Sequence, residues 1–310
     1  MITRRQAVVG SLFAAGSQIA VGSSVAASSV VKDYPILSAQ ALRYGLAALL
    51  LVAVARRLPR LRREDVPRLI LLAATGLAGF NVFLIGAVRE GDPGSVGVIV
   101  GAVPVALALT APILRGEAPR PSVVAAAVVV SIGAAAVQWT GDGLSVLAFG
   151  LAIGALASEA AFSLVALPLL RRLGPIGTST YASATAAVML AAGAVLTDGA
   201  GALPAPSGAE IVAIVHLAVI VTAVAFVLWY SSLGLLGVER AGLFAGLIPV
   251  AALVTTALIG ETAVSPLRLA GAAAVGLGAL IGVRASLRVV AGADNAPALA
   301  PRVGSVRGRS

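Results

Sequence analysis

The sequence contains no cysteine and only one histidine, His216, among its 310 residues. Without cysteine the chain can form neither a disulfide framework nor a thiolate metal site. A single histidine excludes a histidine metal pair, and the H-E-x-x-H and G-x-S-x-G motifs are both missing. The G-x-x-x-x-G-K-[ST] phosphate-binding loop is missing as well. We therefore expect a protein that is not an enzyme, uses no metal or cofactor and does not hydrolyse ATP.

Charged residues are also scarce, at 11% of the chain, whereas 59% is hydrophobic and the mean hydropathy is +1.02. Soluble domains carry about 25% charged residues, so this balance indicates a membrane protein. The net charge of +9 would suggest nucleic acid in a soluble chain. Here the arginines lie in short runs between apolar stretches, as orientation signals do. The expected partner is the lipid bilayer, not nucleic acid.

Ten apolar segments follow one another, each close to the roughly 20 residues that a bilayer span needs. They are too long for barrel strands, and backbone groups in lipid must be satisfied within the segment, so they are expected to be helices. The sequence thus predicts an all-α integral membrane protein with ten transmembrane helices. The predicted spans are 7–30, 36–55, 67–88, 94–114, 121–140, 145–170, 174–196, 209–233, 241–259 and 266–286. Residues 288–310, which are polar and rich in Pro and Gly, are expected to be a disordered cytoplasmic tail.

The basic residues predict the orientation. With the N-terminus inside, 18 of the 22 basic residues fall at cytoplasmic helix ends. Both termini should therefore face the cytoplasm. The N-terminal "TRRQAVVG" and "SVAAS" offer an alternative, because together they resemble a twin-arginine export peptide whose cleavage would leave nine helices. The basic residues left on the external side are Lys32, Arg43, Arg89 and Arg268.

A repeated phrase divides the chain into two halves. "GVIVGAVPVA" at 97–106 and "GLFAGLIPVA" at 242–251 match at five of ten positions, 145 residues apart. Five helices per half is an odd number, so the second half must enter the membrane from the opposite side, as in many secondary transporters. Duplication kept only for packing is the alternative, since small-xxx-small spacing also lets helices approach closely. The expected units are 1–142 and 143–287, and the expected kink and packing residues are Gly97, Gly101, Pro104, Gly242, Gly246 and Pro249.

Ten helices in two inverted halves, with Pro104…Glu117 and Pro249…Glu261, resemble the EamA family of the drug/metabolite transporter superfamily. The resemblance covers residues 7–286, although the first half has one extra residue between Pro and Glu. It implies a bacterial inner-membrane carrier that exports amino acids or other small metabolites by alternating access. A proton gradient is one expected driving force, and a homodimer is an expected assembly. A non-enzymatic channel or scaffold is the alternative function.

Polar residues at membrane depth are costly and tend to be functional. Glu159 lies near the middle of the sixth span, where a carboxylate must face a cavity or a cation, or take up a proton; a structural hydrogen bond between helices is the alternative. Gln18 occupies the matching depth of the first span and is expected to be its partner. Arg43 could snorkel to the surface, pair with Glu159 or bind a substrate carboxylate. All three are candidate substrate or coupling-ion residues.

Three further residues complete the candidate site. Asn81 and Tyr230 are expected to line the transport path. His216, near the outer end of the eighth span, is either a proton relay or a structural residue. Trp139 and Trp229 are expected to be interfacial anchors.

Glu117 and Glu261 follow the two copies of the repeated phrase, at helix–loop junctions. A carboxylate just before a helix can satisfy free N–H groups and meet a favourable dipole. We expect both residues to cap the following helix or to close a gate.

Overall fold

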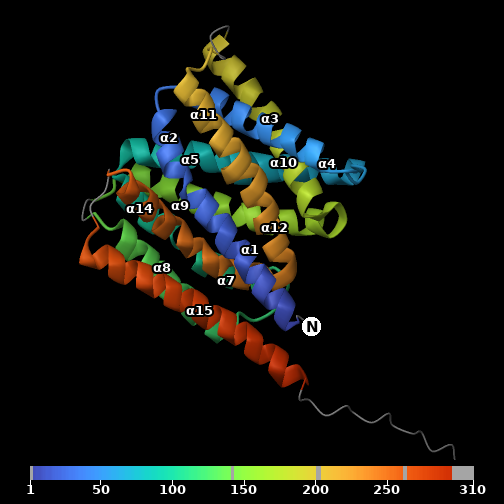
Figure 1. Cartoon of the computed structure of the whole chain (residues 1–310), viewed down its shortest axis with the longest axis vertical. Coiled ribbons are helices and arrows are strands. Elements are labelled where there is room, and N and C mark those ends of the chain that lie inside the picture. The colour runs from blue at the N-terminus through green and yellow to red at the C-terminus, as the bar shows by residue number, and fades with distance from the viewer. Residues whose placement is uncertain (1–2, 141–142, 200–203, 261–263, 295–310) are drawn as a thin grey trace, which may run out of the picture.

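The computed structural model describes residues 3–140, 143–199, 204–260 and 264–294, which form helices and short connections (Figure 1). Nine helical stretches in this part of the chain are long and apolar enough to cross a membrane, and α15 supplies a tenth helix. The first five are α1–α2 (Arg4–Gly22, Ser24–Val30), α3 (Ile36–Val54), η1–α4–η2–α5 (Arg63–Asp65, Val66–Leu72, Ala73–Gly79, Phe80–Glu90), α6–α7 (Pro93–Val100, Val103–Ile113) and α8 (Pro121–Gln138). The second five are α9 (Val146–Leu164), α10 (Ala166–Asp198), α11–η4–α12 (Gly208–His216, Leu217–Val224, Ala225–Leu236), α13–η5–α14 (Val238–Gly242, Leu243–Gly246, Leu247–Leu258) and α15 (Pro266–Asp294). The all-α fold of ten membrane helices is confirmed.

Two helix boundaries differ from the prediction. The sixth helix, α9, ends at Leu164 instead of residue 170, and α10 begins at once and bends at Gly174 (φ +68°). Pro175 lacks an N–H, and Gly174 tolerates the left-handed conformation, so the chain turns there before it enters the seventh span. α15 continues to Asp294, past the point where the tail was expected to start; residues 295–310 lie outside the described residues.

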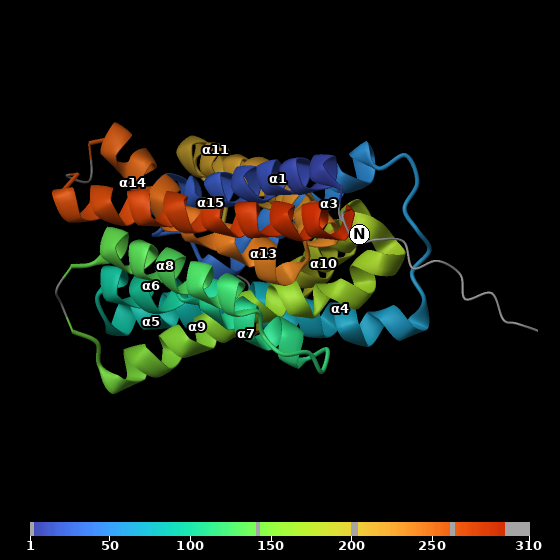
Figure 2. The ribbon, with the colours of Figure 1, turned by 90° about the horizontal axis from the view of Figure 1, so that it is seen from below.

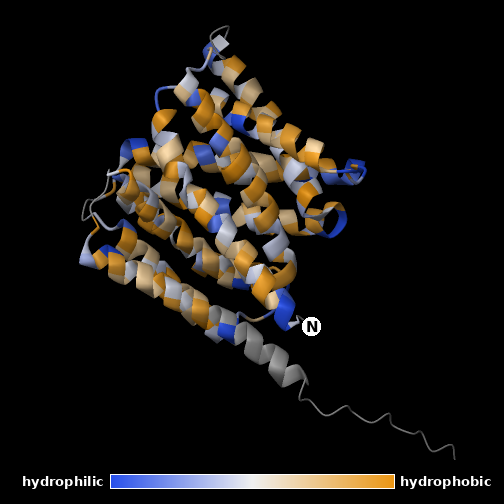
Figure 3. Cartoon of the chain, viewed as in Figure 1, coloured by the Kyte–Doolittle hydropathy of each residue, from blue (hydrophilic) through white to orange (hydrophobic). Residues whose placement is uncertain are grey.

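The ends of the helices form two opposite faces of the molecule. Figure 2 shows the start of α1, the connection from α3 to α4 and the end of α15 at one face. The ends of α8 and α14 lie at the opposite face. Hydrophilic residues gather at helix ends and in loops, whereas the sides of the bundle are largely apolar (Figure 3). This distribution is that of a multi-pass membrane protein.

The two halves meet where α8 crosses α15. A methyl group on Gly133 would lie 2.7 Å from the Gly271 carbonyl oxygen, so the two backbones are in direct contact. The symmetry-related contact is also present: a methyl group on Gly278 would lie 3.1 Å from the Ala126 carbonyl oxygen. Ala126 and Gly271, like Gly133 and Gly278, are 145 residues apart. Equivalent helices that pack antiparallel on each other are related by a twofold axis in the membrane plane, which is the geometry of inverted repeats.

A second symmetric feature is a pair of π-helical segments. η2 (Ala73–Gly79) interrupts the third span and η4 (Leu217–Val224) interrupts the eighth, about one repeat length apart. Apolar periodicity did not predict either segment. π-Helical turns are uncommon and often occur at functional sites. Both segments lie beside the cavity described below.

The repeated phrase also interrupts its helix in both halves. The first copy separates α6 from α7 at Gly101, and the second contains the 3-10 turn η5 before α14. Pro104 and Pro249 therefore lie in the first turn of the helix that follows, where a missing N–H removes no hydrogen bond.

Candidate functional site

A central cavity of about 80 Å³ lies between the two halves and gathers four of the predicted polar residues. Gln18 comes from α1, Arg43 from α3 and Asn81 from α5, all in the first half. Glu159 comes from α9, the first helix of the second half. The sequence predicted these four individually, and the fold places them around one space.

Glu159 lies in the wall of this cavity, and no described residue forms a hydrogen bond or ion pair with its carboxylate. A structural hydrogen bond between helices, the alternative considered for this residue, does not form in the structure. The carboxylate is therefore available to a ligand or a proton.

Arg43 is held at two of its guanidinium nitrogens. Its Nε donates to the Thr222 hydroxyl at 2.7 Å and its Nη1 to the Gln40 amide oxygen at 3.2 Å, while the guanidinium lies 5.0 Å from the centre of the Tyr44 ring. Thr222 in turn donates to the Leu217 carbonyl oxygen at 2.9 Å, within η4. The π-helical segment thus fixes the side chain that orients Arg43. This geometry differs from snorkelling, because the guanidinium lines the cavity.

Aromatic rings form a further part of the wall, and most of them were not predicted from the sequence. Phe162 and Phe226 lie 4.8 Å apart, Tyr44 lies beside Phe226, and all three line the cavity. Trp229 also lines it, is 3% exposed and donates from Nε1 to the Ser163 hydroxyl at 3.1 Å. The expectation that Trp229 anchors at the interface was wrong. Trp229 lies four residues before the end of the predicted span 209–233, where an anchor is expected, so no signal in the sequence separated it from one.

Asn81 lies between the central cavity and a larger one at the face that the sequence predicts to be external. This cavity, called the external vestibule for that predicted side, has a volume of about 650 Å³ and is rimmed by charged residues such as Lys32, Arg89 and Asp198. Asn81 donates to the Leu77 carbonyl oxygen at 2.7 Å and to the Tyr44 hydroxyl at 3.3 Å. The amide therefore stands at the junction of vestibule and cavity.

The first copy of the repeated phrase borders another cavity, and the second copy mostly packs. Gly97, Gly101, Pro104 and Pro249 line a space of about 310 Å³ that also touches Glu159. Gly242 and Gly246 instead face apolar side chains: methyl groups there would lie 3.0 Å from Leu107 Cδ1 and 2.2 Å from Val130 Cγ1.

Two predicted site residues lie outside the central cavity. Tyr230 is fully buried behind it, stacked on Phe162 at 5.0 Å, and its hydroxyl has no hydrogen-bond partner in the described structure. His216 lies at the end of α11, 3.1 Å from the Ser23 hydroxyl. That hydroxyl donates to the Ala20 carbonyl oxygen at 2.7 Å, so His216 Nε2–H is assigned as the donor. This contact joins α11 to the break between α1 and α2, which fits the structural alternative.

Glu117 does not cap the helix that follows it, because the residue before α8 is Arg120 and no side chain caps that helix. Glu117 instead accepts from Arg115 at 2.9 Å, and Arg115 also pairs with Glu239 at the start of α13. The hydrogen bond from Arg115 and the charge of its guanidinium lower the pKa of the Glu117 carboxyl. Arg115 thus links the two halves at the end that the sequence predicts to be cytoplasmic. Glu261 lies outside the described residues.

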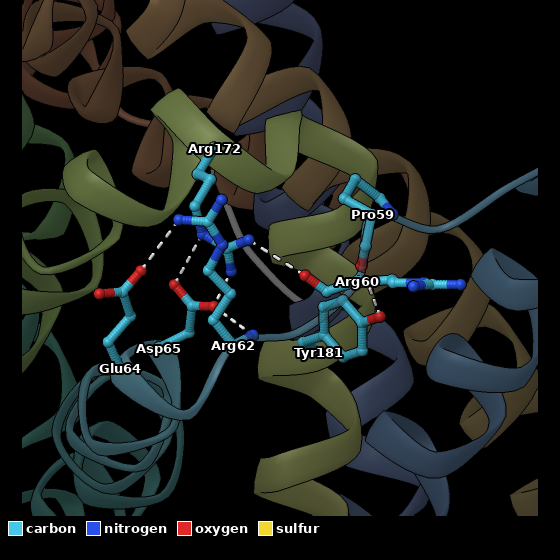
Figure 4. Close-up of polar contacts among 7 residues, drawn as sticks. All are labelled: Pro59, Arg60, Arg62, Glu64, Asp65, Arg172 and Tyr181. Atoms are coloured by element: carbon cyan, nitrogen blue, oxygen red, sulfur yellow. Dashed lines mark hydrogen bonds and ion pairs between the residues drawn. The ribbon is translucent and has the colours of Figure 1, made fainter.

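A second polar cluster joins the halves at the same end, shown in Figure 4. Asp65, which is buried, forms an ion pair with Arg172, and Arg172 Nε donates to it at 2.9 Å. Asp65 also accepts from the Arg62 backbone N–H at 2.7 Å. The Tyr181 hydroxyl donates to the Pro59 carbonyl oxygen at 2.9 Å, so α10 holds the connection between α3 and α4 at two points.

Comparisons with known proteins agree with this architecture. The profile of the EamA-like transporter family matches the chain twice, over residues 8–139 and 146–284. The "Uncharacterized transporter YetK" of Bacillus subtilis (strain 168) is 24% identical over 240 residues, which is 74% of this chain and 73% of that protein. A protein of known crystal structure superposes with a TM-score of 0.75 at 21% identity, covering 92% of this chain and 98% of the other. The last similarity concerns the fold alone.

Proposed function

Because the chain belongs to the EamA-like transporter family, we propose that it is a secondary-active exporter of small zwitterions such as amino acids. One observation supports this function above the others. Arg43 and Glu159, from opposite halves, line the same small cavity and do not pair with each other. A ligand with one carboxylate and one ammonium group can satisfy both charges at once.

The two charges have distinct roles in this proposal. Arg43 Nε and Nη1 are engaged by Thr222 and Gln40, so Nη2 is directed to the ligand carboxylate. Glu159 receives the ligand ammonium, and Gln18 supplies an amide beside them. Burying a charge is costly unless it is paired, so ligands that lack either group bind weakly. The cargo leaves chemically unchanged.

Access to the site alternates between the two faces of the membrane. The central cavity shares Asn81 with the external vestibule, whereas ion pairs of Arg115 and Arg172 join the halves at the cytoplasmic end. In this proposal the structure represents the outward-open state. Rocking of the halves about the α8–α15 contact would open the other face. The protein acts in the bacterial inner membrane with both termini in the cytoplasm.

Glu159 is also the coupling residue in this proposal. When no cargo is bound, the carboxylate has no partner and is costly to keep charged at membrane depth. It therefore takes up a proton from the external side and releases it to the cytoplasm. Proton entry and cargo exit then share one residue, which makes them mutually exclusive at the site.

The test is counterflow of labelled amino acids in proteoliposomes, with and without a pH gradient. Glu159→Gln keeps the shape and hydrogen-bonding capacity of the side chain but removes its titration. The variant should fold normally, and its rate of gradient-driven transport should fall at least about tenfold. Glu210→Gln, at an exposed helix start, is the control and should behave as wild type. A channel would show no trans-stimulation by unlabelled cargo. Unchanged rate, affinity and pH response in Glu159→Gln would leave the residue structural.

A further inference from the structure

The central cavity is small for the cargo it is proposed to bind. Its volume of about 80 Å³ is well below the roughly 150 Å³ of an engineered protein cavity that accepts benzene. In the proposed function it receives the carboxylate and the ammonium group of the cargo, at Arg43 and Glu159. An amino acid with a branched or aromatic side chain needs more space than this cavity offers.

A second chamber of about 310 Å³ adjoins the first. Glu159, Phe80 and Val21 line both spaces, so the chambers share one wall and its carboxylate. This apolar chamber is bordered by α6, α7 and η5–α14, and its other lining residues are mostly aliphatic or glycine. Ser24 and Gln138 are the remaining polar side chains in its described lining.

We propose that the apolar chamber is the binding subsite for the cargo's side group, and that it selects amino acids with large apolar side chains. This inference rests on the proposed function. A zwitterion whose ammonium group contacts Glu159 has its carboxylate directed to Arg43 on one side of that residue. Its side chain then points into the space on the other side. Burial of apolar surface there contributes about 25 cal/mol per Å² to binding.

The first copy of the repeated phrase supplies one wall of the chamber. Gly97 and Gly101 let this wall approach α8, since methyl groups there would lie 2.2 Å from the Gln138 side chain and 3.3 Å from Ala134 Cβ, while Val100 contributes an isopropyl group to the lining. Ile248 faces the same space from the second half. A cargo side chain would therefore contact both halves, next to the breaks in α6–α7 and η5–α14. Its size would then affect the movement of the two halves in the proposed cycle.

The test changes the chamber volume at one position and compares two cargoes. Val100→Phe fills the space, and should weaken phenylalanine transport at least about tenfold while alanine transport changes less than about twofold. Val100→Ala enlarges the space and should leave alanine unchanged while favouring tryptophan. Ile248→Phe fills the chamber from the other half and should reproduce the Val100→Phe pattern. Leu109→Phe, on the exposed face of α7, is the matched control.

Binding is measured separately by fluorescence of Trp229, in a Trp139→Phe background that leaves one tryptophan. Equal losses for alanine and phenylalanine in both filling variants would overturn the subsite, as would wild-type behaviour in both. If the filling variants raise the transport of every cargo, the chamber holds a lipid chain in wild type. That result also contradicts the proposal. If wild type neither binds nor moves any zwitterion, the proposed function fails. If it moves them without preference for side-chain size, only the subsite fails.

Discussion

At the scale of single residues, the cavity depends on side chains that orient others. Thr222 is fully buried, accepts from Arg43 Nε and donates to Leu217 within the π-helical segment. Thr222 does not line the cavity, so its role is to position the arginine. A hydrogen bond to a charged group is worth about 1.5–3 kcal/mol.

Thr222→Val keeps the shape of the side chain but removes the acceptor. We expect the half-saturating cargo concentration to rise at least about tenfold, since tenfold corresponds to about 1.4 kcal/mol, with less effect on the maximal rate. Thr222→Ser retains the hydroxyl and should restore affinity. Concentration-dependent uptake into proteoliposomes measures both values. Equal affinity in Thr222→Val and wild type would show that Arg43 is oriented without this contact.

At the scale of helices, the cap of α6 predicts that the stability of the fold depends on acid. Asp92 caps α6: its carboxylate accepts from the Thr140 hydroxyl and from the Ser95 N–H, each at 2.6 Å. The Thr140 hydrogen bond, helped by those from Ser95, lowers the pKa of the Asp92 carboxyl. A lowered folded-state pKa contributes stability above the unfolded value of about 3.9 and loses it as the pH falls through the folded value.

Asp92→Asn should therefore flatten the fall in melting temperature below about pH 4. Asp92→Ala should also lose about 1 kcal/mol of stability at neutral pH, because it removes the cap. Thermal unfolding in detergent at several pH values tests both. If the melting temperature of Asp92→Asn falls as steeply at low pH as that of wild type, other carboxylates cause the acid dependence.

A second prediction at this scale concerns the contact of η2 with α9. A methyl group on Gly76 would lie 2.8 Å from Phe162 Cα, which is backbone and cannot rotate away. Gly76→Ala should cost about 1–3 kcal/mol and impair transport. Gly150→Ala, also on α9, is the control, because a methyl group there would meet nothing within 4 Å. It should leave the stability unchanged or raise it slightly. Melting temperatures of the two variants decide the matter: equal values would mean that η2 and α9 adjust freely.

At the scale of the whole molecule, the arginine distribution predicts topology. A reporter fused after residue 290 should be active only in its cytoplasmic form, and one in the 198–208 loop only in its external form. Reporter activity in intact cells is the measurement. The same side for both fusions would contradict the structure, because the start of α1 and the end of α15 lie at one face and an odd number of spans separates them from that loop (Figure 2).

The sequence predicted the span number, the repeat and the polar centre, because each rests on local composition. Glu159, Arg43, Gln18 and Asn81 stood out as polar residues in apolar surroundings. The sequence could not predict the two π-helical segments or the aromatic wall of the cavity. An extra residue in a helical turn and the direction in which Trp229 points both depend on packing between helices that are distant in the sequence. The capping role of Glu117 failed for a local reason: Arg115, two residues earlier, binds the carboxylate.

The ion pairs between the halves have a further consequence, for the waiting state of the empty carrier. A perfect twofold scaffold would give its two open states equal free energy, because each would be the image of the other. In the proposed alternating-access cycle, Arg115–Glu239 and Arg172–Asp65 break this equality, because both pairs lie at one end of the molecule. They would shift the resting population toward the state in which that end is closed. Such a bias decides at which face the empty site waits, whereas the gradients alone decide the direction of net flux.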